Sequence, residues 1–216
     1  MEFLQKIADK IQSMNKTRDP SEFNDEIAMR TEWESFNKGS SNFNTHRLTE
    51  ETGYGLRYKP TKSLYFLCGM FMALGGGTAI ATVASALNQG KDINRDVIYP
   101  ALFGLVFFAI GYGLFIGLRR PVFFDQTERC MVIKDARTYF SDIHALQLVV
   151  QRGGKHRNYQ LNLVLRDTAR VYVMNYADSR TARADAARVA QVIGLASNRI
   201  WDAMPGYDVQ IPHGSF

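Results

Sequence analysis

The sequence contains few of the residues from which disulfide frameworks, metal sites and catalytic centres are built. Its 216 residues include two cysteines and four histidines, and no CxxC pair is present. Neither a disulfide framework nor a zinc site is indicated. The P-loop, dinucleotide-binding, HExxH and GxSxG motifs are also missing. We therefore expect a protein without enzyme activity, bound metal or cofactor.

The histidines form no recognisable site in the sequence. They are scattered, none has a partner four residues away, and we interpret each as a surface or hairpin residue: His46, His144, His156 and His213. The run Gly75-Gly76-Gly77 is similar to a phosphate-binding loop only in composition, because it lies within apolar sequence. Helix packing or a kink explains this run better.

The charge balance is basic, with a formal net charge of +5 and a pI of about 9.2. Cytoplasmic flanks of membrane helices carry excess Lys and Arg, which anionic headgroups attract. None of the compact nucleic-acid-binding signatures is present, so we expect no nucleic-acid partner. The mean hydropathy of −0.20 conceals two long apolar segments between polar flanks.

The apolar segments are residues 63–87 and 97–118, and neither contains a charged residue. Each exceeds the ~20 residues that a helix needs to cross a bilayer. The linker of residues 88–96 is short, so the two helices must be antiparallel neighbours. The sequence therefore predicts a transmembrane hairpin over residues 63–118. Since no ionisable group lies inside either helix, we do not expect transport by this chain alone.

Positive charges beside the helix ends predict the orientation. They precede the first span and follow the second: Arg57, Lys59, Lys62, Arg119 and Arg120. The two basic residues of the linker are accompanied by two aspartates. The positive-inside rule then predicts cytoplasmic termini and a linker outside.

Small residues recur every four positions in both spans. The stripes are Gly69, Ala73, Gly77, Ala81 and Ser85 in the first, and Ala109, Gly113 and Gly117 in the second. Close approach over small side chains drives helix association in lipid. The simplest interpretation is that the stripes meet within the hairpin. The alternative is that one stripe forms a homodimer or docks a larger partner.

The chain before the hairpin divides into amphipathic helices over residues 1–36 and short strands over 37–62. Residues 1–16 have one apolar stripe and form either an in-plane membrane helix or a helix packed on the cytoplasmic domain. A second helix is predicted from Asp19-Pro20 to about Trp33, since aspartate caps helices and proline suits the first turn. Strands are expected at 43–48 and 55–58, completing the cytoplasmic domain.

The chain after the hairpin, residues 119–203, predicts a strand-rich domain followed by a tail at 204–216. Strands are expected at 122–124, 129–134, 143–151, 159–166 and 170–174. A helix capped by Asp178 or Ser179 should end at Gly194. Its apolar face contains Ala182, Ala186, Val189 and Ile193. The opposite face, with Arg180, Arg183 and Arg188, is either solvated or in contact with anionic lipid or a partner.

This order of strands closed by one amphipathic helix resembles a pleckstrin-homology-like fold. The stretches FDQTERCMVIKDARTYFSDIHALQLVV and YQLNLVLRDTARVYV, with IGLASNRIWD, resemble such domains in bacterial inner-membrane proteins with paired helices. The resemblance covers roughly residues 40–202 and implies an α+β membrane protein. Its parts would be a two-helix transmembrane hairpin and a cytoplasmic antiparallel β domain closed by a C-terminal helix. In a departure from that pattern, the hairpin separates the first strands from the rest, so one domain would be built from both flanks.

The segment RGGKHR at residues 152–157 is the most unusual part of the domain. Its two glycines permit a tight turn between strands, which is one interpretation. The other is a basic surface that binds anionic headgroups or an acidic partner, made by Arg119, Arg120, Arg152, Lys155, His156 and Arg157. We expect a non-enzymatic inner-membrane adaptor or scaffold that presents this domain to a protein partner and to anionic lipid. The expected partners are anionic headgroups together with another protein or, in a homo-oligomer, a second copy. The alternative is an accessory subunit of a larger transporter or membrane enzyme, docked through the small-residue stripe.

Overall fold

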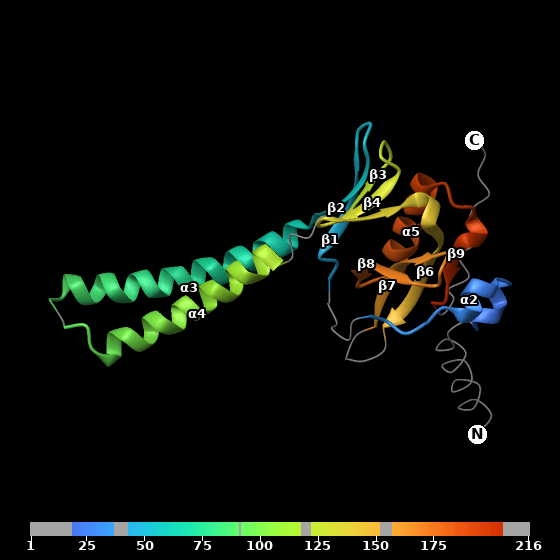
Figure 1. Cartoon of the computed structure of the whole chain (residues 1–216). Helices are drawn as coiled ribbons and strands as arrows, with labels where there is room; N and C mark the ends of the chain where they lie inside the picture. Colours follow the sequence, from blue (N-terminus) through green and yellow to red (C-terminus); the bar gives the residue numbers. More distant parts are fainter. Residues whose placement is uncertain (1–18, 37–42, 91, 118–121, 152–156, 205–216) are drawn as a thin grey trace, which may run out of the picture.

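The structure is a computed structural model that describes residues 19–36, 43–90, 92–117, 122–151 and 157–204. It is an α+β protein in which a helical hairpin projects from a β domain (Figure 1). The hairpin consists of α3 (Lys62–Asn88) and α4 (Arg95–Gly117). Both helices are long and apolar enough to cross a membrane. At 27 residues, α3 is about 40 Å long.

Residues at the helix ends explain where the hairpin begins and turns. The Thr61 side chain accepts a hydrogen bond from the Leu64 amide and so caps α3. Before α4, the Asn94 side chain accepts from the Asp96 amide in the same way. These caps satisfy backbone donors that the first turn of a helix leaves open.

The first sheet, sheet A, has the strand order β1-β2-β3-β4-β5. All neighbours are antiparallel, and the strands are β1 (His46–Glu51), β2 (Gly55–Pro60), β3 (Val122–Asp125), β4 (Cys130–Ile133) and β5 (Ala136–Tyr139). β2 precedes the hairpin and β3 follows it, yet they pair directly, with Leu56 opposite Phe124. One sheet is thus built from both flanks of the hairpin.

The second sheet, sheet B, has the order β8-β7-β6-β9. Its strands are β6 (Ile143–Gln151), β7 (Asn158–Leu165), β8 (Arg170–Tyr176) and β9 (Ile200–Asp202). The short β9 pairs parallel with β6, whereas the other pairs are antiparallel. Helix α5 (Ser179–Ile193) lies between β8 and β9 in the chain and packs on both sheets.

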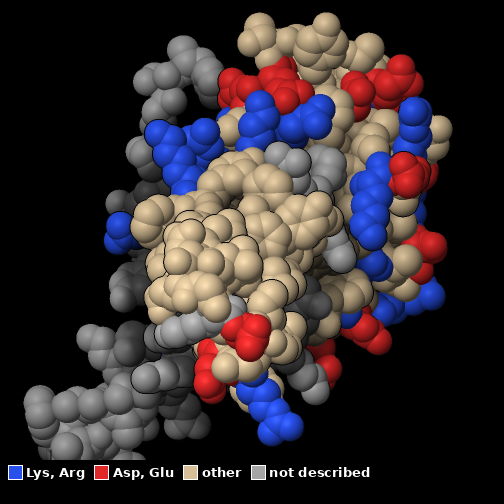
Figure 2. All heavy atoms as spheres, turned by 90° about the vertical axis from the view of Figure 1, so that its left-hand side faces the viewer, with Lys and Arg blue, Asp and Glu red and all other residues tan. Residues whose placement is uncertain are grey.

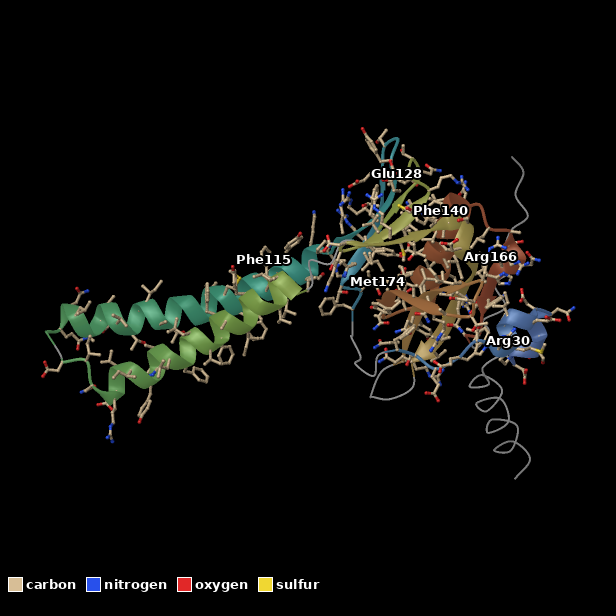
Figure 3. All side chains as sticks on the ribbon, viewed as in Figure 1. Arg30, Phe115, Glu128, Phe140, Arg166 and Met174 are labelled. Carbon is tan, nitrogen blue, oxygen red and sulfur yellow. The ribbon has the colours of Figure 1, made fainter. Side chains whose placement is uncertain are left out.

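The main core fills the space between the sheets and α5. Leu161 and Leu163 of β7 point into it, while Val164 faces the opposite side, so the predicted alternation of this strand is confirmed. The core face of α5 is also as predicted, with Ala182 and Ala186 fully buried. Figure 3 shows the contrast with the hairpin, whose side chains spread outward from both helices.

Several boundaries differ from the prediction for local reasons. The expected helix from Asp19 is divided into η1 (Pro20–Phe23) and α2 (Glu26–Arg30). Asn24 adopts a left-handed φ of 53°, and Asp25 then caps the second piece. Strands β5 and β9 were not predicted, because each is short and lacks an alternating pattern. The interpretation of residues 1–16 falls outside the described residues.

Candidate interaction surfaces

The predicted basic surface lies mostly outside the described residues. Arg119, Arg120, Arg152, Lys155 and His156 belong to segments that the structure does not describe. Arg157 is described and is exposed just before β7. That these six residues form one basic surface therefore stays a prediction.

The predicted small-residue stripes do not meet within the hairpin. All eight residues are exposed: Gly69, Ala73, Gly77, Ala81, Ser85, Ala109, Gly113 and Gly117. A Cβ added at any of the four glycines among them would meet no neighbouring atom within 4 Å. The stripes face away from the partner helix, so only their interpretation as a site for another chain stays a prediction.

Other glycines lie at the contact between α3 and α4. A Cβ on Gly75 would lie 2.4 Å from the Phe108 amide nitrogen, and one on Gly104 would lie 2.5 Å from the Gly75 carbonyl oxygen. Gly111 is equally confined, 2.8 Å from the Phe71 Cβ. Gly77 is only two residues from Gly75, but two residues correspond to about 200° around a helix. Small residues thus occupy both sides of α3, and spacing alone does not show which side meets α4.

Sheet A carries charged residues on the face that turns away from α5. Arg47 lies directly opposite Lys59, and Glu51 forms ion pairs with Lys59 at 3.1 Å and with Arg57 at 2.9 Å. The Arg57 guanidinium also lies 4.5 Å from the centre of the Phe123 ring. Figure 2 looks along the hairpin and shows Lys and Arg directly above its base, with Asp and Glu beyond them.

The N-terminal segment, residues 19–36, packs on the outer face of sheet B. Phe23 and Trp33 stack on each other and both contact Trp201, which is fully buried. Polar contacts extend this attachment, since Arg170 donates to the Glu34 carbonyl and pairs with the Glu32 carboxylate at 2.7 Å. The segment therefore covers a second, smaller core.

One histidine lies in a charged cluster that sequence spacing did not indicate. His144 Nε2 lies 2.9 Å from the Asp25 carboxylate, which also pairs with Arg199 at 2.5 Å. Burial raises the pKa of Asp25, but hydrogen bonds from His144 and the Ile27 amide, with the Arg199 charge, outweigh it and lower the pKa overall. These residues come from three distant parts of the chain. The cluster ties the N-terminal segment to sheet B.

A second titratable group is buried in the main core. The Tyr58 and Tyr176 hydroxyls are hydrogen-bonded to each other, and Tyr176 also bonds to Asp185 of α5. Asp185 is 6% exposed, and its Oδ2 atom has no hydrogen-bond partner. Burial raises the pKa of Asp185. Because Tyr58 belongs to β2, this network connects the strand that leads into the hairpin with α5 and β8.

The arginine face of α5 is not merely solvated. Arg183 pairs with Asp202 of β9 at 2.6 Å, and Arg188 pairs with Glu50 of β1 at 3.0 Å. Arg188 also donates to the Leu48 carbonyl and so reaches the edge of sheet A. A half-open cavity of about 400 Å³ lies beside this arginine, between the tip of the β1–β2 hairpin and α5.

No protein-family model, curated protein or solved structure matches the chain. Among the described residues, no group of three His, Cys, Asp or Glu side chains could hold a metal ion. The described residues therefore present packing surfaces, ion pairs and the half-open cavity beside Arg188.

Proposed function

We propose that the protein is a non-enzymatic membrane adaptor with a pleckstrin-homology-like domain. In this proposal α3 and α4 cross a bacterial inner membrane, and both termini lie in the cytoplasm. The β domain is held at the bilayer surface and presents itself to a protein partner and to anionic lipid. Large apolar side chains spread over both helices support the placement of the hairpin in lipid, with Phe66 75% exposed and Ile80 72% exposed.

The observation that carries the proposal is the pairing of β2 with β3 across the hairpin. A domain on a single flexible tether samples many orientations. Here β2 leads into the hairpin and β3 follows it, so two paired strands of one sheet attach the domain to the hairpin. Such an attachment suits presentation of a fixed surface to a partner.

Photo-crosslinking in living cells tests this role. A photoreactive residue is placed at Arg157, on the domain, and separately at Ala73, on the hairpin. We expect a discrete protein adduct from position 157. In the protein without the photoreactive residue, charge reversal of Arg152, Lys155 and Arg157 should reduce recovery of the partner without loss of folding. Adducts only to lipid or to a second copy would contradict an adaptor role.

The alternative function is an accessory subunit held in a larger membrane complex by the exposed stripe. The open space around Gly77 favours it, because bulk added there does not disturb the hairpin itself. Leu at Ala73 and Gly77 should then abolish co-purification with the complex. The matched control is Val83→Leu, an exposed position of α3 outside the stripe. Unchanged co-purification of the stripe variant would argue against this alternative.

A further inference from the structure

The outward face of sheet A, called here the open face, is the side opposite α5. Side chains alternate across each strand. Leu56, Phe124 and Met131 point into the core, and their neighbours Arg57 and Phe123 point the other way. Figures 1 and 2 place the open face on the side from which the hairpin projects.

Charges on the open face are sorted along the strands. The row nearest α3 pairs Arg47 with Lys59. The next row lies about 7 Å further along the strands and contains Arg57 of β2 and Arg137 of β5. Phe123 of β3 and Val132 of β4 occupy the paired positions between these two arginines.

The row farthest from the hairpin contains carboxylates instead. It holds Glu51 of β1 and Asp125 of β3, both paired with Gly55 of β2. Cationic side chains thus start beside the hairpin and carboxylates start farther from it, with Glu51 reaching back to pair with Arg57 and Lys59.

Two cations of the open face stay accessible to solvent while each has a carboxylate partner, Glu51 for Lys59 and Glu128 for Arg137. The side chains of Lys59 and Arg137 are 46% and 57% exposed. Like charges directly opposite each other, as Arg47 and Lys59 are, destabilise a sheet in water. The Glu51 carboxylate pairs with Lys59 and offsets part of this cost, and an anion bound beside Arg47 and Lys59 would offset the rest.

We infer that the open face of sheet A is a docking surface for anionic phospholipid headgroups. The inference rests on the proposed membrane-spanning hairpin, because α3 begins at Lys62, three residues after Lys59. With α3 beginning there, the cationic rows lie at headgroup level and the carboxylate row lies farther from the bilayer. The surface consists of Arg47, Arg57, Lys59 and Arg137 and is distinct from the predicted basic loop at residues 152–157. Each cation should strengthen docking about fivefold.

Fluorescence quenching in nanodiscs tests the inference on the full chain. A bimane label is attached to a cysteine at Val132, in the middle of the open face, and as a control at Ala187, an exposed position of α5. Both native cysteines are buried. Nanodiscs of neutral lipid, or of neutral lipid with phosphatidylglycerol, carry a headgroup nitroxide as quencher. We expect quenching at Val132 that rises with phosphatidylglycerol and falls with salt, and little quenching at Ala187.

Matched charge removal sharpens the test. The pair Arg47→Gln with Arg137→Gln removes two charges from the open face and should weaken docking about 25-fold. The control pair Arg30→Gln with Arg180→Gln removes two exposed charges elsewhere and should leave quenching unchanged.

Equal quenching at Val132 and Ala187, or quenching indifferent to phosphatidylglycerol, would overturn the inference. A Val132 label that is not quenched in nanodiscs but is protected from solvent in native membranes would also overturn the inference, since a protein would then occupy the open face. A label at Leu74 quenched by acyl-chain nitroxides reports separately on the hairpin. Failure at Val132 with quenching at Leu74 refutes the headgroup surface alone, whereas failure at Leu74 refutes the membrane hairpin.

Discussion

The hairpin and the β domain are packed in opposite ways. In the hairpin, glycines such as Gly75 and Gly104 lie inside, and large residues such as Phe66 lie outside. In the β domain, Phe124 and Trp201 are fully buried, and charged groups such as Arg137 lie on the surface. In the proposed membrane placement of the hairpin, close approach of the helix backbones holds the helices together, whereas burial of large side chains stabilises the β domain. The two regions therefore depend on different residues for stability.

Trp201→Ala should give the largest effect, in the β domain. It removes a fully buried ring that Phe23 and Trp33 contact, so we expect a loss of about 3–5 kcal/mol in the free energy of unfolding. Denaturant unfolding of the domain in detergent, followed by circular dichroism, measures it. The N-terminal segment should also become sensitive to protease. A loss below 1 kcal/mol would show that this second core does not contribute to domain stability.

Gly75→Leu should disrupt the hairpin and leave the β domain folded. The added side chain collides with the backbone of α4, and overpacking costs about 1–3 kcal/mol. Spin labels at Leu74 and Phe103, both exposed, report the distance between the helices by electron resonance. The distance distribution should broaden. Gly77→Leu, the control two residues away, should leave it unchanged, and equal effects of both variants would refute the observed helix interface.

Asp185→Asn should give the smallest effect and stabilise the domain. The folded state raises the pKa of Asp185 above its ordinary value of 3.8, so the folded protein binds this proton more tightly than the unfolded chain. The cost of the buried charge is absent below pH 3.8 and complete above the folded pKa, so stability falls as pH rises through this range. The variant should gain on the order of 1 kcal/mol at pH 7 and lose this pH dependence. Thermal unfolding of both proteins at pH 4 and pH 7 measures both effects, and a variant less stable than the wild type at pH 7 would contradict the assignment.

Sequence patterns predicted the features that depend on local periodicity. Two uncharged segments gave the helices of the hairpin, and the alternation of β7 gave its core face. Asp178 and Gly194 marked the ends of α5. In each case the residues that decide the structure are neighbours in the chain.

Two features that depend on distant contacts were not predicted. The cluster of Asp25, His144 and Arg199 has no spacing signal, because its members meet only when the N-terminal segment covers sheet B. The hairpin interface was missed for a different reason, since small residues at four-residue spacing occur on two sides of α3. Gly75 and Gly77 lie on different sides of α3, and spacing in the sequence does not specify which side faces α4.

The most direct test of the account is a disulfide across the hairpin, between β2 and β3. Arg57→Cys and Phe123→Cys place cysteines at directly opposed positions, and a protease site is inserted in the linker between α3 and α4. After oxidation and cleavage, the two fragments should stay joined on a denaturing gel and separate on reduction. The control protein carries Arg47→Cys and Phe123→Cys, at positions that are not paired in the sheet. Fragments that separate without reduction would contradict a β domain built from both flanks of the hairpin.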